Sequence, residues 1–184
     1  MNAEWPFELG ADRFADLISV YLRLAEVEKQ RRDPEAIESI AVLDDLSLHL
    51  ARYLVVRSAG FVEWIRDSNA REYVGAHSRP EVATRAGHDL FKGQGVTSDQ
   101  LKTFMGTFSS AWTAEIGECL AANFEKQGSL ASEIGTLVKS RKSIAHGDGD
   151  VVSPSRALEL CRASVAIATW IAEHFQARIA SLEA

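Results

Sequence analysis

Apolar residues recur every three to four positions along most of the chain, which is the spacing that gathers them on one face of an α-helix. One such run covers about residues 14–31, and a stronger one covers residues 34–69. Alternation of apolar and polar residues, which is typical of strands, is nearly absent. The pattern predicts an all-α helical bundle with short connections and antiparallel long helices.

Prolines and hydroxyl side chains mark where the helices are expected to begin. Pro34, Pro80 and Pro154 each stand where the first residue of a helix would lie, because proline there costs no helical hydrogen bond. Thr97 and Gln100 have the spacing of a capping box, which predicts another helix start.

Three further helices are predicted after residue 100. The first extends from Trp112 to about Phe124, and the second begins near Ser129. The second ends at Gly147, since a glycine just past the last turn is a common helix stop. The last helix extends from Pro154 to about residue 182.

Gly60 lies in the middle of the long second helix. Glycine at such a position costs about 1 kcal/mol relative to alanine. We therefore expect another helix to approach the chain closely at Gly60.

The 184 residues fit a single unit, in which residues 1–40 form an N-terminal helical extension packed on a helical domain of residues 41–184. No apolar run approaches the ~20 residues needed to span a bilayer, and the first residues lack the pattern of a secretion signal. Cys119 and Cys161 are isolated thiols, typical of a reducing compartment. These features predict a cytoplasmic protein with no membrane association.

The net charge is −6, which argues against a general nucleic-acid coat protein. Charge is nevertheless locally positive at Lys139, Arg141 and Lys142. Four arginines also recur along the second helix, and the simplest interpretation is that they form a solvated face. These are Arg52, Arg57, Arg66 and Arg71.

Arg141 and His146 are the strongest candidates for chemistry. Arginine neutralises phosphate oxygens at any physiological pH, and histidine exchanges protons near neutrality. Together they can cleave RNA without a metal, because the RNA 2′-hydroxyl supplies the nucleophile.

Arg141 and His146 are five positions apart, with four residues between them, and on an ideal helix this turns their side chains about 140° apart. They can face one site only if the helix ends or bends between them. The other arrangement is that two copies of the motif meet across a dimer interface.

The segment Arg141-Lys142-Ser143-Ile144-Ala145-His146-Gly147 resembles the Arg-x4-His signature of HEPN-domain ribonucleases, in particular the RiboL-PSP-type branch. The resemblance extends over about residues 43–175. Upstream of the motif it includes small residues followed by an aliphatic residue and Glu63, at about the distance from the motif that is usual in that branch. Lys142 is a departure, since asparagine commonly follows the motif arginine in that branch.

The resemblance implies a metal-independent endoribonuclease that acts as a homodimer, with a composite cleft lined by Arg141 and His146 of both chains. In this interpretation His146 is the general acid or base, and Arg141 stabilises charge on the reacting phosphate. The remaining expected roles are phosphate binding by Lys139 and Lys142, hydrogen bonding by Ser140 or Ser143, and orientation of the motif by Glu63.

Such proteins are toxins or antiviral defence effectors. Some are neutralised by modification of a tyrosine just past the motif histidine, but no tyrosine follows His146 here. We therefore expect control by a protein antitoxin or a sensor protein.

Simpler interpretations stay open for the same residues. His146 can be a histidine at a helix C-terminus, which the helix dipole favours, and Glu63 can be a surface residue. The protein can also be a catalytically inactive HEPN-like adaptor that binds RNA, nucleotide or a partner protein. A third alternative is an unrelated helical regulatory domain.

Neither a metal nor a cofactor is predicted. Asp148, Asp150 and Glu159 fall at three positions of a calcium-binding loop. However, Val152 occupies a position that needs a ligand, and Ser153 occupies the position that needs a glycine. Neither cysteine lies in a context that would activate a thiol.

Overall fold

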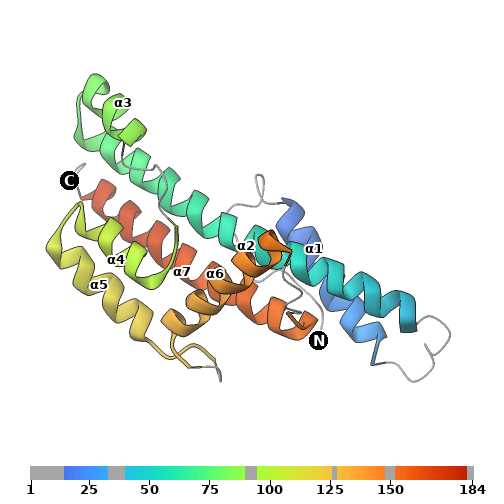
Figure 1. The fold of residues 1–184 in the computed structure, drawn as a ribbon. Coiled ribbons are helices and arrows are strands. Elements are labelled where there is room, and N and C mark those ends of the chain that lie inside the picture. Colours follow the sequence, from blue (N-terminus) through green and yellow to red (C-terminus); the bar gives the residue numbers. More distant parts are fainter. Residues whose placement is uncertain (1–14, 33–39, 90–94, 126–127, 148–151, 182–184) are drawn as a thin grey trace.

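The computed structural model describes residues 15–32, 40–89, 95–125, 128–147 and 152–181. Within these ranges the chain folds into seven helices (Figure 1), and the only β-type pairing is an isolated bridge between Asn123 and Ser129. The prediction of an all-α bundle is therefore confirmed. The helices are α1 (Ala15–Gln30), α2 (Ile40–His77), α3 (Pro80–Asp89), α4 (Ser98–Gly106), α5 (Ser110–Ala121), α6 (Leu130–His146) and α7 (Pro154–Ala180).

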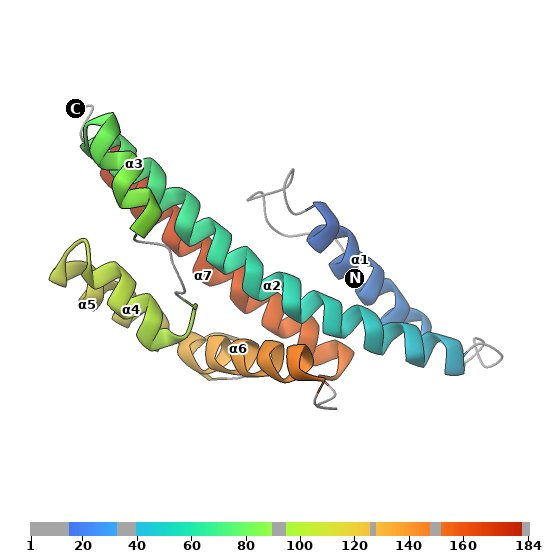
Figure 2. The ribbon, with the colours of Figure 1, turned by 45° about the horizontal axis from the view of Figure 1, so that its top comes forward.

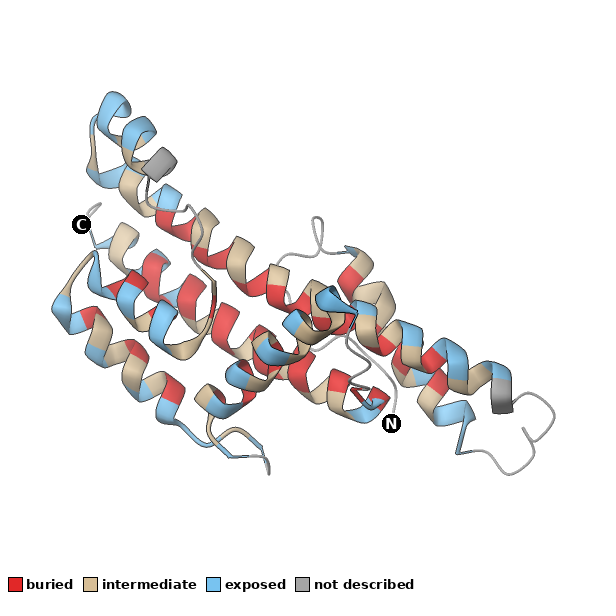
Figure 3. Ribbon diagram, in the orientation of Figure 1, coloured by how far each residue is buried: buried red, intermediate tan, exposed pale blue. Residues whose placement is uncertain are grey.

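Helices α2 and α7 form the centre of the molecule. Both carry a continuous line of buried positions where they face each other (Figure 3). On α2 this face includes Leu54, Phe61 and Ile65, and on α7 it includes Leu160 and Ile171. Burial of these side chains removes apolar surface from water, the main favourable contribution to folding.

The two central helices run in the same direction. Gln176 of α7 donates a hydrogen bond to Asn69 of α2 at 3.2 Å, while Ser58 lies beside Cys161 near the other end of the pair. The expectation of antiparallel long helices is therefore wrong for α2 and α7. Short connections impose antiparallel packing only on consecutive helices, and here α3 to α6 return the chain to its starting end (Figure 2).

Helix α1 lies antiparallel to α2 and also contacts α7. Its Leu17 and Leu24 are completely buried. At one end Asp16 pairs with Arg57 at 2.7 Å, and at the other Arg31 pairs with Asp44 at 2.6 Å. The expected N-terminal helix thus packs on the bundle over the part that the structure describes.

The local capping signals are confirmed. Thr97 and Gln100 form a reciprocal capping box at the start of α4. Ser129 and Ser153 cap α6 and α7 through hydrogen bonds from backbone N–H groups. Each cap satisfies a donor that a helix N-terminus would otherwise leave without a partner.

Two boundaries differ from the sequence prediction. Helix α2 continues past residue 69 to His77, because Tyr73 still packs against Phe108, Trp112 and Phe175. Helix α5 ends at Ala121 rather than near residue 124. The expected start of α2 at Pro34 lies outside the described residues.

The environment of Gly60 also differs from the expectation. No described atom outside the local helix backbone lies within 4 Å of a Cβ placed on this glycine. No other described helix of the same chain therefore makes the close approach that the sequence suggested.

Candidate functional site

Arg141 and Glu63 form the contact that ties the last turns of α6 to α2. The Arg141 Nη1 donates a hydrogen bond to Glu63 Oε1 at 2.7 Å. Both side chains are partly exposed, Arg141 to 40% and Glu63 to 28%. Glu63 is therefore placed to orient the arginine, and the guanidinium keeps access to solvent.

His146 is the last residue of α6 and is exposed. Gly147 follows in the left-handed conformation, with φ of 75°, and its N–H donates to the carbonyls of Ile144 and Ser143. Glycine adopts this conformation without the penalty that a Cβ imposes. The predicted helix stop is therefore confirmed, and it falls after the histidine.

Helix α6 is continuous from Arg141 to His146. The side chains of these two residues accordingly leave the helix about 140° apart. Arg141 points to the α2 side of α6, whereas His146 points to the solvent side. A helix end between the two residues, one of the two arrangements expected from the sequence, is not what the structure shows.

Lys139, Lys142 and His146 follow one another at spacings of three and four, which places them on one face of α6. All three are exposed. None of the three makes a side-chain hydrogen bond or ion pair with another described residue. We call these three residues the basic stripe. Ser140 and Ser143 are half-buried to the side of it.

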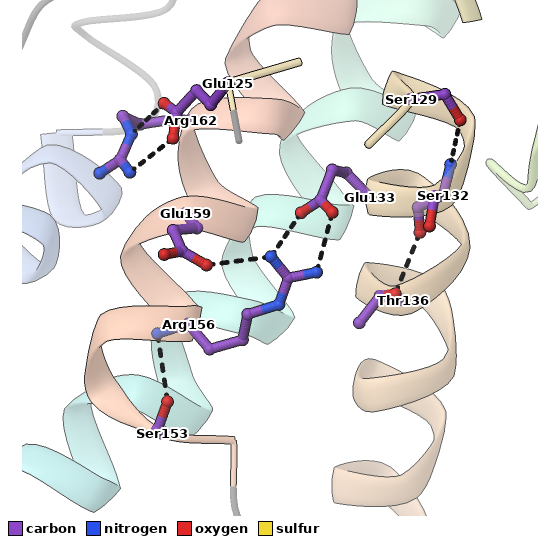
Figure 4. Close-up of polar contacts among 9 residues, drawn as sticks. All are labelled: Glu125, Ser129, Ser132, Glu133, Thr136, Ser153, Arg156, Glu159 and Arg162. Atoms are coloured by element: carbon purple, nitrogen blue, oxygen red, sulfur yellow. Dashed lines mark hydrogen bonds and ion pairs between the residues drawn. The ribbon is translucent and has the colours of Figure 1, made fainter. Parts of the chain in front are cut away.

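The N-terminal half of α6 is held by buried charge (Figure 4). Glu133 is 1% exposed and pairs with Arg156 of α7 at 2.6 Å. Arg156 also donates to Glu159 at 3.0 Å. The hydrogen bond to Glu133 raises the pKa of Arg156 above its usual value. This network fixes α6 on α7 and so determines where the last turns of α6 lie.

The sequence analysis did not identify Glu133 as a buried charge, although the periodicity of the apolar residues around it indicates one. It lies among the buried residues Leu130, Ile134 and Leu137, so the apolar periodicity assigns it to the inner face of α6. A charged residue at such a position is rarely buried without a partner. Nothing in the local sequence identifies Arg156 as that partner.

Arg66 also departs from the expected solvated face of α2. Its side chain is 1% exposed and binds Asp67 at 2.6 Å. Its Nη1 donates to the Gly95 carbonyl at 2.6 Å, and the guanidinium lies over the ring of Phe104. Arg66 therefore joins α2 to the segment before α4 and is not available to an RNA ligand.

His174 has an environment opposite to that of His146. It is nearly buried, stacks on Trp170 and meets the edge of Trp112. Its Nδ1 lies 3.3 Å from Glu115. Burial, together with the nearby Arg178, lowers the pKa of His174 to about 4. This histidine is neutral at physiological pH and acts as part of the core.

The thiols are also poorly suited to chemistry. Burial raises the pKa of Cys119 to about 11 and that of Cys161 to about 12. The reactive form of cysteine is the thiolate, so both side chains are unreactive near neutrality. Among the described residues, no group of three or more histidine, cysteine, aspartate or glutamate side chains is arranged to hold a metal ion.

No family model, no curated protein and no solved structure matches this chain. Over the described ranges, none of the helices combines the length and the apolar character needed to cross a lipid bilayer.

Proposed function

We propose that the protein is a metal-independent endoribonuclease, in which the C-terminal turns of α6 from two copies form the cleavage site. The basic stripe is the observation that carries the proposal. A chain of net charge −6 leaves Lys139, Lys142 and His146 exposed on one face, without partners among the described residues. The positive charges of Lys139 and Lys142, which no described carboxylate neutralises, attract a polyanion such as RNA.

The proposed reaction uses the 2′-hydroxyl of the RNA as the nucleophile. The 2′-oxygen bonds to the adjacent phosphorus, and the bond from phosphorus to the 5′-oxygen breaks. His146 accepts the proton of the 2′-hydroxyl or donates one to the leaving 5′-oxygen. Arg141 stabilises the negative charge that develops on the phosphate. The products carry a 2′,3′-cyclic phosphate and a 5′-hydroxyl.

The requirement for two copies follows from the geometry of α6. Arg141 and His146 of one chain point about 140° apart, so a single copy does not direct both at one phosphate. In a homodimer, Arg141 of one copy can act with His146 of the other. Glu63 then holds Arg141 in a defined orientation through its hydrogen bond of 2.7 Å.

An adaptor function is the second candidate, and the same ion pair favours it. Because Glu63 already neutralises Arg141, the arginine needs no external phosphate. The α6 end would then bind RNA, a nucleotide or a partner protein without cleaving it. In either case we propose that the protein is cytoplasmic and is controlled by a protein antitoxin or sensor, as expected for a toxin or antiviral effector.

The deciding experiment is cleavage of total and defined RNA in excess EDTA by the wild type and by His146→Ala. We expect the wild type to leave cyclic phosphates and the variant to lose 10²–10⁴-fold in rate, which is the usual contribution of general acid–base catalysis. His77→Ala is a matched control, because His77 is also an exposed last residue of a helix.

Equal cleavage by the wild type and His146→Ala would contradict the assignment of His146. Absence of cleavage by the wild type, with RNA still bound, would favour the adaptor function. A requirement for a divalent ion would contradict the metal-independent reaction.

A further inference from the structure

The outward face of α6 extends well beyond the basic stripe. At about 100° per residue, seven residues of this helix project within an arc of about 120°. Five of them are exposed and two are half-buried. The residues of this face, which we call the α6 track, are Ser132, Gly135, Thr136, Lys139, Lys142, Ser143 and His146. The track thus combines the basic stripe with small residues, most of which carry hydroxyl groups.

The α6 track presents no negative side chain, although acidic residues outnumber basic ones in the chain by 26 to 20. Helix α6 contains a single carboxylate, Glu133, which is 1% exposed and is paired with Arg156. The basic stripe lies in the half of α6 that carries the negative end of the helix dipole, so its cations offset that end. The N-terminal half carries the positive end of the dipole. Both halves of the track therefore favour an anionic ligand.

Gly135 makes the middle of the track low. It is exposed, and no described atom outside the local helix backbone lies within 4 Å of a Cβ placed on it. Its backbone is helical, so it does not need the left-handed conformation that Gly147 adopts. Glycine is among the least favourable residues inside a helix. A ligand that closely approaches the helix backbone is a physical reason for glycine here, because a side chain would hold that ligand away.

Ser132 and Thr136 place hydroxyl groups one helical turn apart on the same face. The Thr136 hydroxyl donates to the Ser132 carbonyl at 3.0 Å (Figure 4). That carbonyl is also the acceptor for the backbone N–H four residues later in the helix. The hydroxyl can therefore turn to another acceptor without leaving the carbonyl unpaired. Serine and threonine hydroxyls are common donors to phosphate oxygens.

These features fit a sugar–phosphate backbone better than the surface of a protein. The binding energy of a protein interface comes mainly from buried aromatic side chains and arginines, and the α6 track contains neither. Lysines and hydroxyl groups are instead the groups that contact phosphates. A single line of donors matches one strand, whereas a duplex presents two backbones separated by a groove.

We propose that one strand of RNA lies along the α6 track, from the basic stripe to Ser132 near the start of the helix. The strand comes closest to the helix at Gly135. Its phosphates are bound by the lysines of the basic stripe on one side of this point and by the hydroxyls of Ser132 and Thr136 on the other. The track is about 21 Å long at 1.5 Å per residue. At about 3.4 Å per stacked nucleotide, this length holds about six nucleotides.

This inference rests on the proposed function in one respect, which is that the ligand is RNA. It adds the path of the strand and three contact residues outside the cleavage site, namely Ser132, Gly135 and Thr136. The pair of Glu133 and Arg156 holds this half of α6 on α7, so the strand lies on a fixed support. The track leads away from the last turns of α6, which a second copy would contact.

The first experiment measures binding of a fluorescent 2′-O-methyl RNA, which has no free 2′-hydroxyl and is not cleaved. We expect Gly135→Leu to bind at least tenfold more weakly in fluorescence anisotropy, because its side chain fills the point of closest approach. Leucine is a good helix former, so the fold is kept. Gly75→Leu is the matched control and leaves the affinity unchanged. Gly75 is also an exposed glycine inside a helix, with no atom within 4 Å of a Cβ position.

The second variant removes a hydroxyl group. Thr136→Val keeps nearly the same shape, and we expect its affinity for the same RNA to be about two- to fivefold weaker, because one hydrogen bond to phosphate is lost. Thr84→Val on α3 is the control and binds as the wild type does. The Thr84 hydroxyl donates to the Pro80 carbonyl at 2.8 Å, four residues earlier, in the same arrangement as at Thr136.

The third variant adds a charge at the far end of the track. Ser132→Lys should strengthen binding and steepen the slope of log affinity against log salt by about 0.7, because one more phosphate is neutralised. Ser110→Lys adds the same charge in the first turn of α5 and should leave the slope unchanged.

Equal affinities of the wild type, Gly135→Leu and Thr136→Val would overturn the inference, even where cleavage of unmodified RNA upholds the proposed ribonuclease. A wild type that does not bind the 2′-O-methyl RNA would also overturn it. Tighter binding of duplex than of single-stranded RNA would overturn the choice of one strand. Weaker binding by Gly135→Leu, with no cleavage of unmodified RNA by the wild type, would support the track and contradict the ribonuclease.

Discussion

The two halves of α6 each contribute to an arginine–glutamate pair, and the pairs differ in their access to water. Near the N-terminal end, Glu133 is 1% exposed and is held by Arg156. Near the C-terminal end, Arg141 and Glu63 are 40% and 28% exposed. The distances between the paired atoms are nearly equal, 2.6 and 2.7 Å. The two pairs therefore differ in their exposure to solvent and not in the distance between their paired atoms.

The difference indicates separate roles along one helix. A buried carboxylate depends on its partner, because removal of either group leaves a charge without solvent or counterion. An exposed pair exchanges its partner for water or for a ligand at little cost. The first half of α6 therefore anchors the helix, and the second half presents charge to the outside. His174 and His146 show the same contrast between a buried and an exposed histidine.

The largest expected effect is at the buried pair. Arg156→Ala leaves Glu133 buried and unpaired, and we expect it to lower the free energy of unfolding by about 3–5 kcal/mol. Chemical denaturation monitored by far-UV circular dichroism measures the change. Arg141→Ala is the comparison, with an expected loss of at most about 1 kcal/mol. Equal losses in the two variants would remove the distinction between the halves of α6.

The second effect is a loss of stability in acid caused by His174. Its pKa is about 4 in the folded protein and 6.5 without the fold, so the unfolded state binds more protons between these pH values. Stability should therefore decrease as the pH falls from 6.5 to 4. The contribution of this residue is about 3 kcal/mol.

Denaturation curves at several pH values test this effect in the wild type and in His174→Gln. The variant should weaken the pH dependence between 4 and 6.5. A pH dependence that the variant leaves unchanged would contradict the assignment of the buried histidine.

The smallest effect concerns the basic stripe and measures its contact with phosphate. Lys139→Ala should reduce the slope of log affinity against log salt by about 0.7 for a single-stranded RNA. Fluorescence anisotropy over a salt series gives this slope. Lys29→Ala is the control, because Lys29 is exposed on α1 and already lies near Glu26. An unchanged slope for Lys139→Ala would show that this residue of the basic stripe does not contact RNA phosphate.

Local features of the fold were predictable from the sequence. The cap at Thr97, the start of α6 after Ser129 and its end at Gly147 each depend on residues within one turn. The parallel direction of α2 and α7 was not predictable in this way, because it depends on the path of the four helices between them. The length of α2 was also underestimated, since contacts of Tyr73 with distant rings extend it.

The candidate site shows the same limit. The spacing of Arg141 and His146 predicts how far their side chains diverge, and the continuous helix keeps that angle. The Arg141–Glu63 bond spans 78 residues of sequence, and only the resemblance to HEPN ribonucleases suggested it. The burial of Arg66 depends on a carbonyl 29 residues away. The spacing of apolar and polar residues within a helix does not indicate which distant residues its side chains will bind.

The pairing of α2 with α7 has a consequence for synthesis of the chain. The middle of α2 leaves the ribosome roughly 100 residues before the middle of α7, which at usual elongation rates is about 5–20 s. Throughout that interval the inner face of α2, with Leu54, Phe61 and Ile65, has no access to the helix that buries it. Until the last described helix emerges, this face of the nascent chain can be covered only by earlier segments of the chain or by another molecule.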